Sequence, residues 1–159
     1  EALLLNSSKT IHFLLNTLRI LLNEDDIFSR ASVIEYLIIN KIIEIENQNF
    51  SEILYNYSRY SNVDFQVFLQ SKSINFNLHK YVNLNLYELI ENLIRDFNLS
   101  VNNNLFVTFF LDFVLEYTVT KNNSIRDFLQ QWELKKDSLS IIIPNGIDAV
   151  EIMTIHKFI

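Results

Sequence analysis

The stretch "SSKTIHFLLNTLRILLN" (residues 7–23) carries the clearest helical pattern in this chain. Its apolar residues recur three and four positions apart, which places them on one face of an α-helix. They are Ile11, Leu14, Leu15, Leu18, Leu21 and Leu22. Ser7 or Ser8 can cap the first turn, and the helix should stop near Asn23. The chain is therefore predicted to begin with an amphipathic helix that faces a core.

The same spacing predicts most of the remaining chain to be helical. Further helices are expected at 26–43, 50–61, 85–97, 102–119 and 124–136. Residues 63–71 alternate between apolar and polar, so a helix and a strand compete there, and we favour a helix. Residues 72–85 carry no clear period and are predicted to be a loop.

The segment 102–119 is the most apolar of these helices. Apolar side chains cover most of its circumference: Leu105, Phe109, Phe110, Phe113 and Leu115. A helix that is apolar all round is typical of a buried position. We therefore expect this segment to be the central helix of the domain.

The pattern changes near residue 138. "SLSIIIP" (138–144) and "AVEIMTI" (149–155) are rich in β-branched residues and flank a Pro-Asn-Gly turn signal. The predicted fold is mainly α, a bundle of about six or seven helices with two short C-terminal β-strands. We divide the chain into a helical part, 1–137, and a β-rich part, 138–159. Because two strands alone do not form a stable sheet, the tail is expected to belong to a larger sheet.

Composition excludes several kinds of site. The only glycine among 159 residues is Gly146, so neither a G-x-x-x-x-G-K-[ST] phosphate loop nor a G-x-G-x-x-G turn can be built in this chain. The absence of cysteine removes disulfides and thiolate chemistry. A formal net charge of −6 argues against an autonomous nucleic-acid binder. No apolar run is long enough for a membrane span, no secretory signal is visible, and a cytoplasmic location is expected.

Residue groups with catalytic or metal-binding potential have simpler explanations. The three histidines, His12, His79 and His156, lack metal-ligand spacing. The carboxylate pairs Asp25–Asp26 and Glu88–Glu91 are more typical of solvated helix starts and faces. No serine lies in a G-x-S-x-G context. We therefore assign no catalytic, metal or cofactor-binding residue in this chain.

Aromatic residues could stack on nucleic-acid bases. Trp132 and the tyrosines at 55, 57 and 60 are the candidates, but Arg59 is the only cation interleaved with them. Packing in or over the core is the better explanation.

The polar residues Thr154, His156 and Lys157 lie where the last predicted strand would end. A hydroxyl, an imidazole and an ammonium group suit contacts with a phosphate backbone. On pattern alone, a strand terminus whose polar residues face water explains them better.

"VEIMTIHK" (150–157) closely resembles the start of motif V of the UvrD/Rep-like DNA helicases, V-x-[IL]-[ML]-T-[IV]-H. "EALLLNSSKTIHFLLNTLRILLNEDD" (1–26) is similar to the segment after motif IV in RecB/AddA-type helicase–nucleases, the exodeoxyribonuclease V type. "LYELIENLIRDFNL" (86–99) and "FLDFVLEYTVTKNNSIRDFLQQWE" (110–133) are similar to the later part of the same helical insert. The resemblance spans essentially the whole chain, and its specific part is about eight residues long.

The resemblance implies that 1–137 is the accessory helical subdomain, often called 2B, and that 138–159 returns to the second RecA-like core domain. Its parent would be an ATP-dependent 3′–5′ DNA helicase, with or without a nuclease domain, in repair or recombination. Thr154 and His156 match the family residues beside the single-stranded DNA track, and Lys157 is adjacent. ATP and Mg²⁺ would bind elsewhere in the parent. The expected partners are DNA, the helicase core domains and a nuclease subunit.

This chain departs from the family after Lys157. The family continues with a small residue and Lys-Gly-Leu-Glu, whereas Phe158 and Ile159 stand here. The part of the motif that couples DNA binding to the nucleotide site is therefore not seen. The alternative interpretation is a free-standing helical module for protein–protein interaction, whose tail adds a strand to a partner's sheet.

Overall fold

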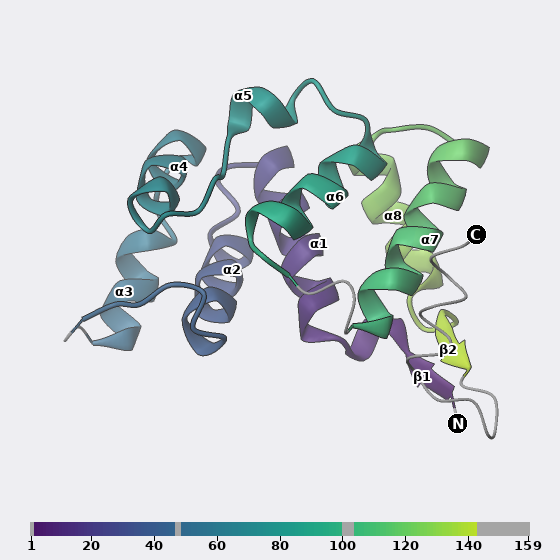
Figure 1. Cartoon of the computed structure of the whole chain (residues 1–159), viewed down its shortest axis with the longest axis horizontal. Helices are drawn as coiled ribbons and strands as arrows, with labels where there is room; N and C mark the ends of the chain where they lie inside the picture. The colour runs from purple at the N-terminus through teal and green to yellow at the C-terminus, as the bar shows by residue number, and fades with distance from the viewer. Residues whose placement is uncertain (1, 47–48, 100–103, 143–159) are drawn as a thin grey trace.

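The structure is a computed structural model that describes residues 2–46, 49–99 and 104–142. Over these residues the chain is mainly helical, with two short strands that pair with each other (Figure 1). The elements are β1 (Ala2–Leu4), a 3-10 turn η1 (Leu5–Ser7), α1 (Lys9–Leu22), α2 (Ile27–Ile39), α3 (Phe50–Tyr57), α4 (Asn62–Ser71), α5 (Leu78–Tyr81), α6 (Leu86–Asp96), α7 (Leu105–Thr120), α8 (Ile125–Lys135) and β2 (Ser140–Ile142). The predicted fold class is confirmed.

Helix α1 lies at the centre of the molecule. Figure 1 shows it between α2 on one side and α7 and α8 on the other, and it also packs against α6. Ser8 caps its first turn by accepting the N–H of Ile11 at 3.3 Å. Because neighbours surround the helix, Phe13 and Ile20 are buried in addition to most of the predicted stripe. Leu22, at the end of that stripe, is 38% exposed.

Helix α7 does not have the central position that its composition predicted. Its buried residues are Val107, Phe110, Val114 and Tyr117, whereas Leu115 is 45% exposed. Phe110 and Phe113 pack against Phe128 and Trp132 of α8. Apolar residues on all sides of a helix do not determine which side packs against other helices. Helix α7 lies on the outer side of α1.

The segment predicted to be a loop contains the short helix α5. Asn77 caps it by accepting the N–H of Lys80 at 3.1 Å, and Tyr81 at its end is buried. A helix of four residues is too short to show a period in the sequence. The favoured helical interpretation of 63–71 is confirmed by α4.

Three helices end on a residue in the left-handed conformation, and none of the three is glycine. They are Lys41 after α2, Ser73 after α4 and Asn98 after α6, with φ of 57°, 64° and 54°. In each, the next N–H donates to the third-last carbonyl of the helix, which is the Schellman arrangement. The pairs are Ile42 to Leu37 at 2.9 Å, Ile74 to Leu69 at 3.0 Å and Leu99 to Ile94 at 2.8 Å. Helix α2 therefore ends at Ile39 and not near residue 43.

The two strands come from opposite ends of the described chain. β1 pairs with β2 antiparallel, with Leu3 opposite Ile141 and Leu4 opposite Ser140. The strand expected at 138–144 is thus present over Ser140–Ile142, but its partner is an N-terminal segment that was not predicted to be a strand. The second predicted strand, 149–155, and its turn lie outside the described residues.

Candidate functional site

The two residues that the helicase resemblance selects, Thr154 and His156, lie outside the described residues, as does Lys157. The structure therefore neither brings them together nor separates them. What it does describe is the strand that leads toward them, β2, and the ribbon that β2 forms with β1.

The β1–β2 ribbon forms the base of the helical body. Beyond the paired strands, Leu5 donates its N–H to the carbonyl oxygen of Leu139 at 3.0 Å, so the pairing extends toward the helices. Ile141 is fully buried and joins the hydrophobic core. The chain thus enters and leaves the helical body through two adjacent strands, and Figure 1 shows both at the same edge of the molecule.

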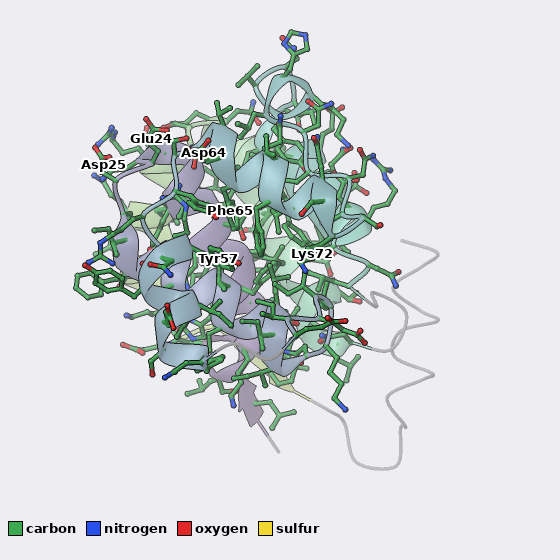
Figure 2. The ribbon with its side chains drawn as sticks, turned by 90° about the vertical axis from the view of Figure 1, so that its left-hand side faces the viewer. Glu24, Asp25, Tyr57, Asp64, Phe65 and Lys72 are labelled. Atoms are coloured by element: carbon green, nitrogen blue, oxygen red, sulfur yellow. The ribbon has the colours of Figure 1, made fainter. Side chains whose placement is uncertain are left out.

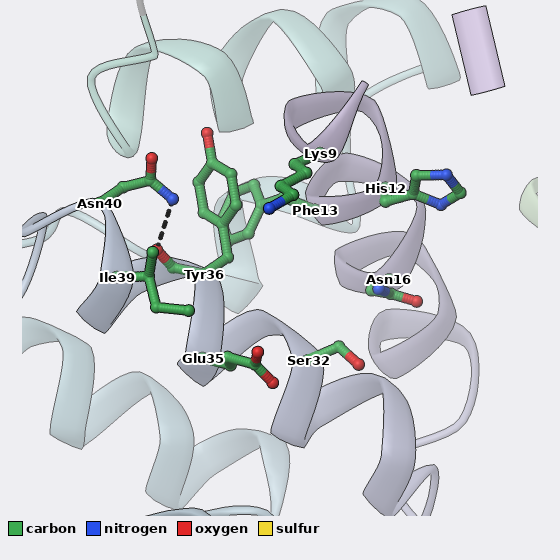
Figure 3. A pocket seen from close by; sticks show the side chains of 9 residues that line it. All are labelled: Lys9, His12, Phe13, Asn16, Ser32, Glu35, Tyr36, Ile39 and Asn40. Atoms are coloured by element: carbon green, nitrogen blue, oxygen red, sulfur yellow. Dashed lines mark hydrogen bonds between the residues drawn. The ribbon is translucent and has the colours of Figure 1, made fainter. Parts of the chain in front are cut away.

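A groove of about 370 Å³ lies between α1 and α2. Figure 3 shows the residues that line it, among them Lys9, His12 and Glu35. Phe13 and Tyr36 stack with ring centroids 4.5 Å apart. The Tyr36 hydroxyl lies 2.9 Å from the hydroxyl of Thr10, so it helps to join the two helices.

The histidine of this groove is held by the backbone. His12 places Nε2 at 2.6 Å from the carbonyl oxygen of Asn6, in the 3-10 turn η1, and Figure 3 shows its ring directed away from Tyr36. A general base needs a hydrogen bond to the group whose proton it removes. The contact of His12 with a carbonyl instead fixes the start of α1 against the turn that follows β1.

A second cavity, of about 440 Å³, lies where the ends of α2, α4 and α6 meet. Asp96 lines it with a side chain that is 3% exposed. Its Oδ2 accepts the Tyr81 hydroxyl at 2.6 Å and the Lys80 ammonium at 2.9 Å. Burial and the hydrogen bond to this carboxylate raise the pKa of Tyr81 strongly. These groups pin α5 to α6, so they serve the fold.

The other residue groups singled out in the sequence have structural roles. Glu88 forms a capping box with Asn85 at the start of α6, and Asp26 caps α2. Trp132 is 1% exposed. Tyr55 is exposed, but the guanidinium of Arg59 covers its ring at 3.8 Å from the centroid.

Arg30 is a residue that sequence reasoning missed. It is fully buried and donates to the carbonyl oxygen of Glu24 and to Oδ1 of Asn62, both at 2.5 Å. Burial lowers its pKa, while the nearby carboxylates of Glu24, Asp26 and Asp25 raise it. The available signal was a cation one turn after Asp26 that falls among the apolar positions of its helix.

Among the described residues, no group of three or more histidine, cysteine, aspartate or glutamate side chains could hold a metal ion. No helix in the same part of the chain is long and apolar enough to cross a membrane. A comparison with protein-family models, curated proteins and solved structures found no match for this chain.

Proposed function

We propose that this chain is the accessory helical insert of an ATP-dependent 3′–5′ DNA helicase or helicase–nuclease of the UvrD/Rep-like type. The parent protein would act in the cytoplasm on DNA during repair or recombination. In this proposal residues 1–137 form the 2B-like subdomain and 138–159 lead back into the second RecA-like domain. Thr154 and His156 would contact single-stranded DNA.

The observation that carries the proposal is the pairing of β1 with β2. An insert must leave its host and return to it at nearly the same place, and close chain ends make insertion tolerable. Here the helical body between Leu5 and Leu139 is enclosed by two adjacent antiparallel strands. A two-stranded ribbon is marginal alone, and further strands from a host sheet would stabilise it.

The charge and composition of the chain support an accessory role. With Gly146 as its only glycine, this chain cannot build the glycine-rich loop that cradles nucleotide phosphates, so ATP and Mg²⁺ would be bound by the parent's core domains. A net charge of −6 disfavours tight duplex binding by the insert itself. An acidic module is better suited to contact the core domains or a nuclease subunit, or to restrain the motor, than to bind duplex DNA tightly.

The test uses the complete parent protein and its affinity for labelled single-stranded DNA, measured by fluorescence anisotropy. Thr154→Ala and His156→Ala should each weaken binding about tenfold, because each removes a hydrogen bond to a charged phosphate. Thr120→Ala and His79→Ala are matched controls, since both side chains lie in the helical part and are exposed. These controls should leave the affinity unchanged.

Two results would contradict the proposal. One is the absence of any ATPase activity of the parent that depends on single-stranded DNA, because a helicase motor requires this activity. Alternatively, the controls could weaken DNA binding as much as the motif V variants, which would make the effect nonspecific.

The second candidate is a helical interaction module, and the β1–β2 ribbon also favours it. Strand addition needs a sheet with an unpaired edge, and the described sheet has only these two strands. Under this interpretation the complete protein binds a partner's strand, and Thr154→Ala and His156→Ala leave DNA affinity unchanged.

A further inference from the structure

Helix α7 is apolar on all sides, yet it lies on the outer side of the helical body (Figure 1). Only four of its sixteen residues are buried. A helix that is apolar all round is typical of a buried position, whereas a surface helix normally presents polar residues to water. The outer face of α7 therefore has the composition of an interface and not of a solvated surface.

Three aliphatic side chains form a row along this outer face. Leu111, Leu115 and Val119 are four residues apart, so they lie on one side of the helix, about one turn from each other. Leu111 is half-buried, Leu115 is 45% exposed and Val119 is 76% exposed. Residues four apart form the ridges that pack into the grooves of a second helix. The spacing and exposure of this row, which we call the α7 row, therefore fit a helical partner segment.

The charges beside the α7 row are negative. Asp112 and Glu116 are the only charged residues of α7, each directly follows a member of the row, and both are exposed. On the neighbouring helix α6, Glu91 and Asp112 of α7 are both close enough to act on Tyr87. Exposed aliphatic side chains with a charged rim are typical of surfaces that bind protein.

This charge decides among the possible occupants of the face. In a symmetric dimer the same patch meets itself, so the carboxylates of α7 would face like charges, which is unfavourable across an interface. A nucleic acid would bring phosphates against the same carboxylates. A helix that carries lysine or arginine beside an aliphatic row of its own matches both the apolar and the acidic part of the surface.

We propose that the outer face of α7 binds an amphipathic basic helix of a partner protein. The aliphatic row of that helix covers Leu115 and Val119 and extends to Leu111, and its cationic side chains pair with Glu116. The inference does not depend on the helicase proposal, because it uses only the composition, exposure and charge of α7.

The test measures the affinity of the full 159-residue chain for a fluorescein-labelled peptide by fluorescence anisotropy. The peptide is about 18 residues long, which gives five helical turns, with leucine at helical spacing and lysine at the remaining positions. A peptide with glutamate in place of lysine should bind far more weakly, because its charges repel the acidic rim. A peptide of the same composition in scrambled order, which has no apolar face, should also bind far more weakly.

The double variant Leu115→Gln/Val119→Gln should lower the affinity about tenfold, because it removes the exposed part of the α7 row. Glutamine is a good helix former, so α7 itself should persist. The matched control is Val63→Gln/Val67→Gln, since these valines are also four apart, on α4, and are 62% and 60% exposed. Helix α4 lies at the opposite end of the molecule from α7, and Figure 2 views that end, with Asp64 of α4 labelled. The control should change the affinity less than about twofold.

The acidic rim is tested by Glu116→Gln, which should weaken binding of the lysine peptide about threefold, because one exposed ion pair is lost. Glu52→Gln, an exposed carboxylate of α3, is its control and should have no measurable effect. Equal binding of the lysine and glutamate peptides would overturn the proposed partner chemistry.

A second measurement locates the bound peptide. The methyl resonances of Leu115 and Val119, followed by carbon-13 NMR, should move as the lysine peptide saturates the chain, while those of Val63 and Val67 should not. Unmoved α7 resonances at saturation would overturn the proposal, as would equal losses of affinity in the two double variants. A homodimer that dissociates in Leu115→Gln/Val119→Gln would overturn it too and assign the face to a second copy.

Discussion

The hydroxyl of Tyr81 supports a buried negative charge. Asp96 is the last residue of α6, where the helix dipole disfavours a carboxylate, and its side chain is almost completely buried. Lys80 and Tyr81, both from α5, supply the two donors that make this position tolerable. A short helix without any apolar period is therefore held in place by polar contacts.

Replacing Tyr81 by phenylalanine should lower the free energy of unfolding by about 2 kcal/mol, because a buried carboxylate loses a hydrogen bond. Urea unfolding followed by circular dichroism measures this change. Tyr55→Phe is the matched control, since Tyr55 is 61% exposed, and its effect should be within about 0.5 kcal/mol.

The pH dependence of this variant follows from the raised pKa of Tyr81. The folded state keeps the Tyr81 proton above pH ~10, where an unfolded tyrosine loses it. At such pH the folded state binds more protons than the unfolded state does, so the contribution of Tyr81 to stability falls as pH rises. The Tyr81→Phe variant and the wild type should approach each other in stability above pH ~10. A constant difference up to high pH would contradict this account.

At the scale of the element, the helix ends are unusual because the chain has one glycine. A left-handed residue with a Cβ costs about 1–2 kcal/mol relative to its relaxed conformation. This cost applies at the ends of α2, α4 and α6, where the left-handed residues are Lys41, Ser73 and Asn98. The Schellman hydrogen bonds and the apolar residue that follows each of them offset it.

Glycine at one of these positions should stabilise the protein. Ser73→Gly removes the steric cost at a φ of 64° and should raise the free energy of unfolding by about 1 kcal/mol. Thermal and urea unfolding both measure this gain. Ser71→Gly, within the same helix, is the control and should instead lose about 0.5–1 kcal/mol. A loss in both variants would mean that the left-handed residue carries no strain.

At the scale of the whole molecule, the β1–β2 ribbon determines where the chain enters and leaves the helical body. Leu5 and Leu139 are joined by a hydrogen bond, so the adjacent pair, Leu4 and Ser140, falls at a position without ladder hydrogen bonds. Such pairs have the shortest Cα separations, about 4.5 Å, which suits a disulfide.

The double variant Leu4→Cys/Ser140→Cys should therefore form a disulfide. Both native residues are exposed and the chain has no cysteine of its own. Closing so long a loop should stabilise the oxidised form by about 4 kcal/mol. The melting temperature with and without reductant measures the gain, and Leu4→Cys alone is the control. If the number of free thiols does not fall on oxidation, the result would contradict the observed strand register.

The helices were predictable where an apolar face coincided with a capping residue. α1, α6 and α8 follow this rule, with Ser8, Asn85 and Ser124 at their caps. The end of α2 was not predictable, because Lys41 gives no signal of a left-handed conformation. The central position of α1 could not be deduced either, since apolar character does not specify which helices are neighbours.

The strand pairing and the junction of α4 with the α1–α2 turn were beyond sequence reasoning for the same physical reason. β1 is three residues long and its partner lies near the other end of the described chain. Arg30 and Asp64 approach one junction only because α4 packs its start against the α1–α2 turn. Thr154 and His156 were selected by resemblance to a helicase motif alone, and they lie outside the described residues.

The pairing of β1 with β2 also bears on the order in which the protein forms during synthesis. A ribosome delivers β1 first and β2 only after all eight described helices. The helices depend on contacts that are mostly closer in sequence, and such contacts form faster than long-range strand pairing. Domains also fold as units while the chain emerges. We therefore expect the helices to fold and pack while the chain is still on the ribosome. The β1–β2 ribbon should form last, and β1 should stay unpaired until β2 has been synthesised.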